Sequence, residues 1–270
     1  MAVLIVADGA VDLPPALEVS GRVRVVPGDI WLGEKPFLAD RNEFWRILRQ
    51  GTFPSTTPPT VSALAEAYRH GDLVLGLHVS AELSATVARA REAAQRAGAR
   101  VVVVDTRSFS VGAGLLAAAV DRAALDPLRG ESIVDVATNL PDELHTFVVV
   151  QDAEALRRSG RAGLLPTDHL ARGRPLLLAV RGRAIVLDQP KDRARALRQL
   201  VTHARRSTDA RVGSWALGHG DATDVDHVTD LLTKSFGHPP DFAVAVDPTV
   251  GAHVGVDAVV VGVMPGRAEG

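Results

Sequence analysis

The chain has 270 residues, carries a formal charge of −2 and contains no cysteine, which excludes disulfides, thiolate catalysis and thiolate metal sites. Because acidic and basic residues nearly balance, the composition argues against a nucleic acid as partner. The apolar runs are far shorter than the roughly 20 residues that span a bilayer. Asp8 interrupts the first of them, so we expect a cytoplasmic protein without a signal peptide.

Over the first 150 residues, short β-branched runs alternate with Ala-rich amphipathic runs, which is typical of a parallel sheet covered by helices. Asp40 and Thr60 stand where they could cap two of these helices, and Glu43 occupies the capping-box position after Asp40. The predicted strands cover 2–6, 73–79, 101–105 and 146–150, and 23–32 is predicted as a β-rich stretch broken by Pro27 and Gly28. The predicted helices cover 41–50, 61–68, 82–97 and 112–124, and 53–60 is predicted as a loop.

The pattern changes near residue 151, so we expect an N-terminal domain over 1–150 and a C-terminal domain over 151–270. Two short apolar runs flank Arg181-Gly182-Arg183, which indicates a β-hairpin. Hairpin and helices together predict a smaller α+β domain. Its predicted strands cover 176–180, 184–187, 212–217, 242–246 and 258–263, and its predicted helices 153–158, 192–206 and 222–236. The segment 251–253 is predicted as a turn between the last two strands.

Hydroxyl side chains gather in two loops of the N-terminal half. Ser55-Thr56-Thr57 lies between prolines, and Ser80 and Ser84 flank the expected start of the helix over 82–97. The N-terminus of a helix carries free backbone N–H groups and can hold an oxyanion. A carboxylate site without a nucleophile–base pair is one reading of these residues, and helix capping is the other.

Other sites find less support in the sequence. Asp8 and Asp12 flank Gly9 just after the first strand, where a metal could bind, but a turn or capping role suits Asp12 better. Gly112 and Gly114 open a helix without the third glycine of a dinucleotide motif, so close helix packing and anion binding both stay open. The nine histidines lack metal-ligand spacing.

Short segments in order along the chain match the motifs of one family. Pro54 to Thr60 resembles the pattern Pro-x-Thr-Ser-Gln-Pro-Ser, and Val79 to Thr86 resembles Ile-Ser-Ser-x-Leu-Ser-Gly-Thr. Through these segments the sequence resembles the DegV family, the fatty-acid-binding subunits of bacterial fatty acid kinases. The remaining segments are Val6 to Pro14, Val25 to Pro27, Asp105 to Gly114, Leu156 to Arg161, Lys191 to Arg193 and Gly251 to His253.

The resemblance implies a DegV-like (EDD-type) α/β fold, related to dihydroxyacetone kinase, with a long-chain fatty acid in an apolar tunnel between the two domains. It implies that a separate kinase phosphorylates the carboxylate, that the protein has no catalytic constellation or cofactor of its own, and that it contacts the membrane only peripherally, for lipid exchange. The residues implied to hold the carboxylate are Thr56, Thr57, Ser84, Ala85 and His253, with Asp8 and Arg161 near the head group or the partner.

The sequence departs from the family pattern at several of these positions. Ala85 and Ser159 stand where the family has glycine, and Gly9 stands where it has serine, which bears on ligand choice and kinase recognition. Two alternatives are a small-molecule kinase subunit like dihydroxyacetone kinase, with His253 bonded to a ketone, and a structural or regulatory protein that has lost its ligand.

Overall fold

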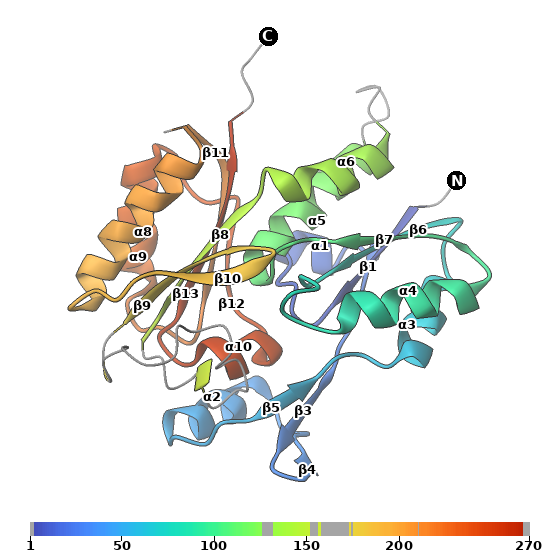
Figure 1. The fold of residues 1–270 in the computed structure, drawn as a ribbon, viewed down its shortest axis with the longest axis horizontal. Coiled ribbons are helices and arrows are strands. Elements are labelled where there is room, and N and C mark those ends of the chain that lie inside the picture. The colour runs from blue at the N-terminus through green and yellow to red at the C-terminus, as the bar shows by residue number, and fades with distance from the viewer. Residues whose placement is uncertain are drawn as a thin grey trace.

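The computed structural model describes residues 3–125, 132–151, 156–157, 173, 175–209 and 211–266. Two large sheets lie side by side, and a small third sheet extends below them (Figure 1). The mixed α/β fold with a parallel sheet was predicted from the sequence. In the described part of the chain, no helix is long and apolar enough to cross a membrane.

The first sheet is entirely parallel, with the strand order β2-β1-β6-β7. Every residue of β6 is buried, as expected for a parallel strand covered on both faces. Helices α3 and α4 pack on one face through Leu64, Ala90 and Ala93. The elements of this half are β1 (Val3–Asp8), α1 (Pro15–Glu18), β2 (Val23–Val26), α3 (Val61–Tyr68), β6 (Leu73–His78), α4 (Thr86–Ala97) and β7 (Arg100–Asp105).

The second sheet is mixed, with the strand order β10-β9-β8-β13-β11-β12. Its outer face is covered by α8 and α9, and the predicted hairpin is present, with Gly182 in the left-handed region at φ +80°. The elements are β8 (His145–Val150), β9 (Leu176–Arg181), β10 (Arg183–Asp188), α8 (Arg193–Ser207), β11 (Val212–His219), α9 (Val225–Phe236), β12 (Phe242–Ala245), α10 (Pro248–Val254) and β13 (Val259–Pro265).

Strand β8 shows how the two halves are joined. It precedes the boundary expected at residue 150, yet it pairs with β9 and β13 of the second sheet. The division into domains at this residue stays a prediction, because the sheets show only where the strands pair.

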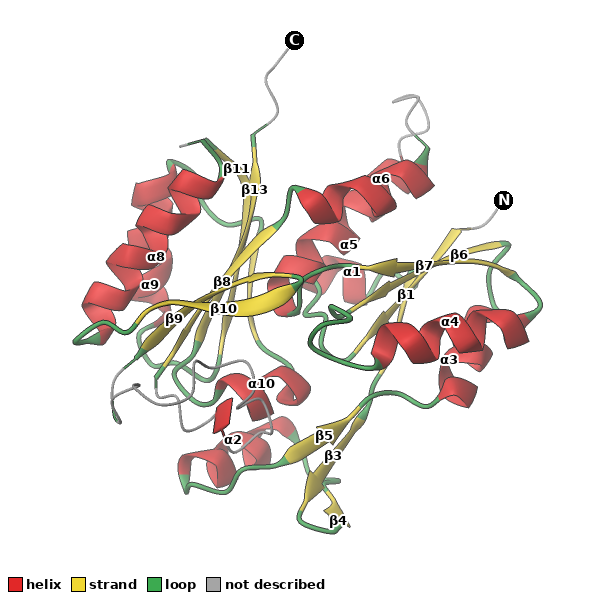
Figure 2. Cartoon of the chain, in the orientation of Figure 1, coloured by secondary structure: helices red, strands yellow, loops and turns green. Residues whose placement is uncertain are grey.

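Helix α5 (Ser110–Leu125) lies between the two large sheets (Figure 2). Its glycines permit this close approach, since a Cβ on Gly114 would lie 2.0 Å from the carbonyl oxygen of Asp12 and one on Gly112 would lie 2.1 Å from Thr146 Oγ1. The structure therefore assigns these glycines to helix packing. Helix α6 (Ile133–Asn139) and the 3₁₀ helix η2 (Leu140–Asp142), which the sequence analysis missed, connect α5 to β8.

The predicted caps are confirmed at two helices. Asp40 accepts a hydrogen bond from the backbone N–H of Glu43 at the start of α2 (Arg41–Arg49), and Thr60 accepts one from Ala63 at the start of α3. The capping box is incomplete, because the Glu43 carboxylate pairs with Arg46 instead of returning to the cap.

Three local expectations were wrong. Helix α4 begins at Thr86 and not near 82, because the N–H groups of Leu83 and Ser84 both turn back to the carbonyl of Ser80. The loop expected over 53–60 contains β5 (Ser55–Thr57), which pairs with β3 (Asp29–Leu32) in the small sheet that β4 (Lys35–Pro36) completes. The segment from Gly251 to His253 is helical and belongs to α10.

The short helix expected over 153–158 lies mostly outside the described residues.

Candidate functional site

A cavity of about 930 Å³ lies between the second sheet and the loops that follow β1 and β6. Its wall carries apolar side chains as well as hydroxyls, a carboxylate and an imidazole. The apolar residues are Val79, Leu83, Phe109, Val148, Val150, Leu156, Leu178, Val180, Ala184, Val250 and Val254. The polar side chains are Asp8, Thr56, Thr57, Ser84, Thr86, Thr249 and His253.

The apolar wall follows from the alternation of side chains along β8 and β9. Val148 and Leu178 are opposite each other in the antiparallel pair and both face the cavity. Their neighbours Val149 and Leu177 point the other way and pack in the core beneath α8 and α9. Both faces of β8 and β9 are apolar, because helices α8 and α9 pack on one face and the other face lines the cavity.

The polar part of the wall brings together residues that are distant in sequence. Thr56 Oγ1 lies 2.9 Å from Nε2 of His253, although the two residues are 197 positions apart. Strand β5 supplies Thr56 and Thr57, the β6–α4 loop supplies Ser84, and α10 supplies His253. All four predicted side chains therefore line one cavity, while their role as carboxylate ligands stays a prediction.

The serines near α4 differ in their surroundings. Ser84 Oγ lies 2.8 Å from Thr86 Oγ1 and accepts a longer bond from the Thr86 N–H. Ser80 is fully buried and its hydroxyl donates to the carbonyl of Gly182 at 2.5 Å, so it ties the β9–β10 hairpin to this loop. Ala85 precedes the helix, is exposed and does not line the cavity.

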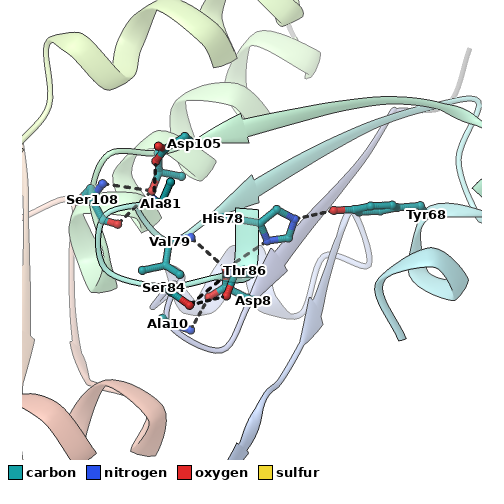
Figure 3. Close-up of polar contacts among 11 residues, drawn as sticks. Asp8, Ala10, Tyr68, His78, Val79, Ala81, Ser84, Thr86, Asp105 and Ser108 are labelled. Carbon is teal, nitrogen blue, oxygen red and sulfur yellow. Dashed lines mark hydrogen bonds and ion pairs between the residues drawn. The ribbon is translucent and has the colours of Figure 1, made fainter. Parts of the chain in front are cut away.

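Asp8 lines the cavity but is already bonded to the protein (Figure 3). One carboxylate oxygen accepts from the N–H of Ala10 at 2.9 Å, and the other accepts from the N–H of Val79 at 2.9 Å. Nδ1 of His78 lies 3.1 Å from that second oxygen, and Nε2 of His78 lies 2.6 Å from the Tyr68 hydroxyl. Asp8 therefore ends a chain of three buried side chains.

The sequence analysis missed Tyr68 and His78. His78 closes a strand that is otherwise apolar, and Tyr68 is the only tyrosine of the chain, but neither fact shows that they meet. Burial raises the pKa of Tyr68, and the Asp8 carboxylate adds to this effect. Gly76 leaves room for the pair, because a Cβ there would lie 2.8 Å from the tyrosine oxygen.

Asp12 connects three segments around the cavity. Its carboxylate accepts a hydrogen bond from the Ser110 hydroxyl at 2.6 Å and another from the N–H of Asp247 at 2.6 Å. Ser110 begins α5 with φ +52°, and Asp247 caps α10, the helix that carries His253. Burial raises the pKa of Asp12 to about 7, although both hydrogen bonds oppose the shift.

The metal site considered between Asp8 and Asp12 finds no support, because the two carboxylates are bonded to different protein groups. Among the described residues, no group of three histidine, aspartate or glutamate side chains is arranged to hold a metal.

Among the positions where the sequence departs from its family, Gly9 lines the cavity. A Cβ there would lie 3.1 Å from Thr249 Oγ1, so little space is left for a larger side chain. Ser159 and Arg161 lie outside the described residues.

The family model and the related sequences that match this chain all name the same family. Residues 2–266 match the family model described as "Uncharacterised protein, DegV family". A DegV domain-containing protein of Deinococcus radiodurans is 31% identical, over 98% of this chain and 99% of its own length. One from Mycobacterium tuberculosis is 29% identical, over 96% of both chains.

Solved structures are similar over nearly the whole chain. A structure described as fatty acid binding of a DegV family protein from Thermus thermophilus has a TM-score of 0.83 and 26% identity, and it covers 98% of this chain and 100% of its own. A stearic-acid-binding protein from Eubacterium ventriosum has a TM-score of 0.85 and 20% identity over 97% of both chains. At 20% identity, the similarity to the Eubacterium ventriosum protein shows a shared fold alone.

Replacing Asp12 by asparagine should change how stability depends on pH. Because the folded-state pKa of Asp12 is raised from 3.8 to about 7, its protonated form stabilises the fold below about pH 4, and this contribution is lost as the pH rises towards 7. Asp12→Asn keeps a neutral side chain that can bond to both Ser110 and Asp247. Relative to the wild type, the variant should gain up to about 1.4 kcal/mol in unfolding free energy per pH unit between pH 5 and 7.

Chemical denaturation at pH 5, 6, 7 and 8 measures this difference, with Asp209→Asn at an exposed position as the control. A difference between Asp12→Asn and the wild type that does not vary with pH would show that Asp12 does not titrate in this range.

Proposed function

The chain belongs to the DegV family, and from this premise we propose that it binds a long-chain fatty acid in the cavity between the two large sheets. The acyl tail lies against the apolar wall formed by β8 and β9, and the carboxyl head lies at the end lined by Thr56, Ser84 and His253.

The observation that carries this proposal is one cavity lined both by apolar side chains of β8 and β9 and by hydroxyl-bearing side chains of β5 and the β6–α4 loop. An acyl chain gains about 0.8 kcal/mol for each CH₂ group removed from water, so apolar surface can supply most of the binding free energy. A few polar groups then suffice to orient the head.

The relatives support the same ligand class. The Thermus thermophilus protein, described as fatty-acid-binding, is 26% identical over 98% of this chain. The structure from Eubacterium ventriosum is described as that of a stearic-acid-binding protein. A straight saturated long-chain acid is therefore the first kind of ligand to test.

We further propose that this protein is a carrier and not itself an enzyme. In this role it presents the bound carboxyl group to a separate kinase, which forms the acyl phosphate, and it exchanges lipid by peripheral contact with the membrane from the cytoplasm. The resemblance of the segment from Leu156 to Arg161 to a family motif supports a role for Arg161 at the kinase contact. The position of Arg161 lies outside the described residues.

Ser84→Ala should weaken the binding of palmitic acid roughly fivefold to tenfold. The variant removes one hydroxyl from the polar end of the cavity, and a net hydrogen bond is worth about 1 kcal/mol. Competition against a fluorescent fatty acid measures the change in Kd. The matched control is Ser62→Ala, because Ser62 is an exposed serine on α3. An unchanged Kd in Ser84→Ala would mean that Ser84 serves only its bonds to Thr86.

Arg161→Ala should leave palmitic acid binding unchanged and slow acyl-phosphate formation by the cognate kinase at least tenfold, because a charge-assisted hydrogen bond to a partner is worth about 1.5–3 kcal/mol. The measurement is acyl phosphate formed per minute at saturating carrier protein, with exposed Arg24 replaced by alanine as the control. Equal turnover for both variants would remove Arg161 from the kinase contact.

A further inference from the structure

Asp8 places a carboxylate in the wall of the cavity that also holds the hydroxyl-bearing end. The residue is only 2% exposed, and both of its oxygens act as hydrogen-bond acceptors. The donors are the N–H groups of Ala10 and Val79 and the ring of His78. These bonds are the arrangement expected around an ionised carboxylate.

Two buried side chains, Tyr68 and His78, lie behind Asp8 (Figure 3). Tyr68 keeps its proton because burial raises its pKa, so its hydroxyl can donate to Nε2 of His78. Nδ1 of His78 lies 3.1 Å from the Asp8 carboxylate on the other side of the ring. Tyr68 and His78 are both fully buried, so water does not compete for these bonds.

A second carboxylate in this cavity meets an unfavourable electrostatic environment. Among the described residues that line the cavity there is no lysine or arginine. Two carboxyl groups that share a site cannot easily both be ionised, and the proton affinity of one of them rises. The hydroxyls of Thr56 and Ser84 can each donate and accept, so they suit a protonated carboxyl group, which needs both; the Thr57 hydroxyl donates to Asp29 and keeps its acceptor sites.

Other charged or titratable groups among the described residues lie near this end, and Asp29 accepts a hydrogen bond from the Thr57 hydroxyl at 3.3 Å. Arg161, which the family resemblance implies near the head group, lies outside the described residues. His253 lies in the wall and contacts Thr56, and Arg89 donates to the carbonyls of Pro58 and Pro59. Asp247 lies beside Gly9, with Arg41 3.9 Å from its carboxylate. His253 is the one of these that lines the cavity and could supply a counter-charge, so the experiment must separate it from Asp8.

We infer that the fatty acid is held as the neutral carboxylic acid, and that Asp8 is the residue that excludes its ionised form. The inference rests on the proposed function, since it concerns the state of the proposed ligand. Asp8 acts as a specificity-determining residue, and Tyr68 and His78 position it.

Palmitic acid labelled with ¹³C at the carboxyl carbon tests this inference directly. The labelled acid is bound to the full chain, and the carboxyl resonance is followed by NMR from pH 5 to pH 9. At low pH the bound carboxyl carbon should have the chemical shift of a protonated acid. We expect the midpoint of its titration to lie about 2–3 pH units above the midpoint of a short water-soluble carboxylic acid. A bound resonance at the ionised position at pH 7 would overturn the inference.

Variants identify the residue responsible. Asp8→Asn should lower the midpoint by about 1–2 pH units, because the variant removes the fixed negative charge. The matched control is Asp105→Asn: Asp105 also ends a strand of the first sheet and also accepts a backbone N–H of the 79–85 loop, from Ala81, but it does not line the cavity. The control should leave the midpoint unchanged, and equal shifts in both variants would contradict the assignment to Asp8.

His253→Gln separates a counter-ion role of His253 from the role of Asp8. If the wild-type head is ionised and His253→Gln loses palmitic acid, His253 is the counter-ion and the inference fails. If no bound resonance is seen at all, the proposed function fails and the inference with it, which separates the two claims. Should Asp8→Asn not fold, the wild-type titration decides alone.

Discussion

The two hydrogen bonds to the Asp12 carboxylate are the constraint on which the cavity depends. They join the loop after β1 to the start of α5 through Ser110 and to the start of α10 through Asp247. Because α5 is packed between the two large sheets and α10 carries His253, this one side chain sets the spacing of the elements that surround the cavity. Its burial is tolerated because both oxygens have partners.

The apolar wall of the cavity and its polar side chains arise from different features of the sequence. Strands β8 and β9 present an apolar wall by simple alternation, which any set of β-branched and leucine side chains could provide. The opposite end depends on particular polar side chains, among them Asp8, Ser84 and His253, each held by loops or helix ends. Affinity in such a site comes chiefly from the wall, and selection among head groups comes from the polar end.

Much of this organisation could be predicted from the sequence, since the period of the apolar residues identifies the strands and long helices, and the hairpin at Gly182 has a clear turn signal. The family motifs also predicted that Thr56 and His253 belong to one site, and in the structure both residues line the same cavity. Short elements escaped prediction: α10 spans only Pro248–Val254, so its apolar period is too brief to distinguish from a turn. The contact between Tyr68 and His78 was also missed, because it depends on how a helix packs over a sheet, and no local pattern encodes that.

The central claim is that the cavity between the sheets holds one long-chain fatty acid. Native mass spectrometry of the chain incubated with palmitic acid tests it most directly, alongside Ala184→Phe, which places a ring in the apolar wall. The account predicts one bound palmitic acid per wild-type chain and little or none on the variant, with the variant folded by circular dichroism. A bare wild-type mass, or equal occupancy of both proteins, would contradict it.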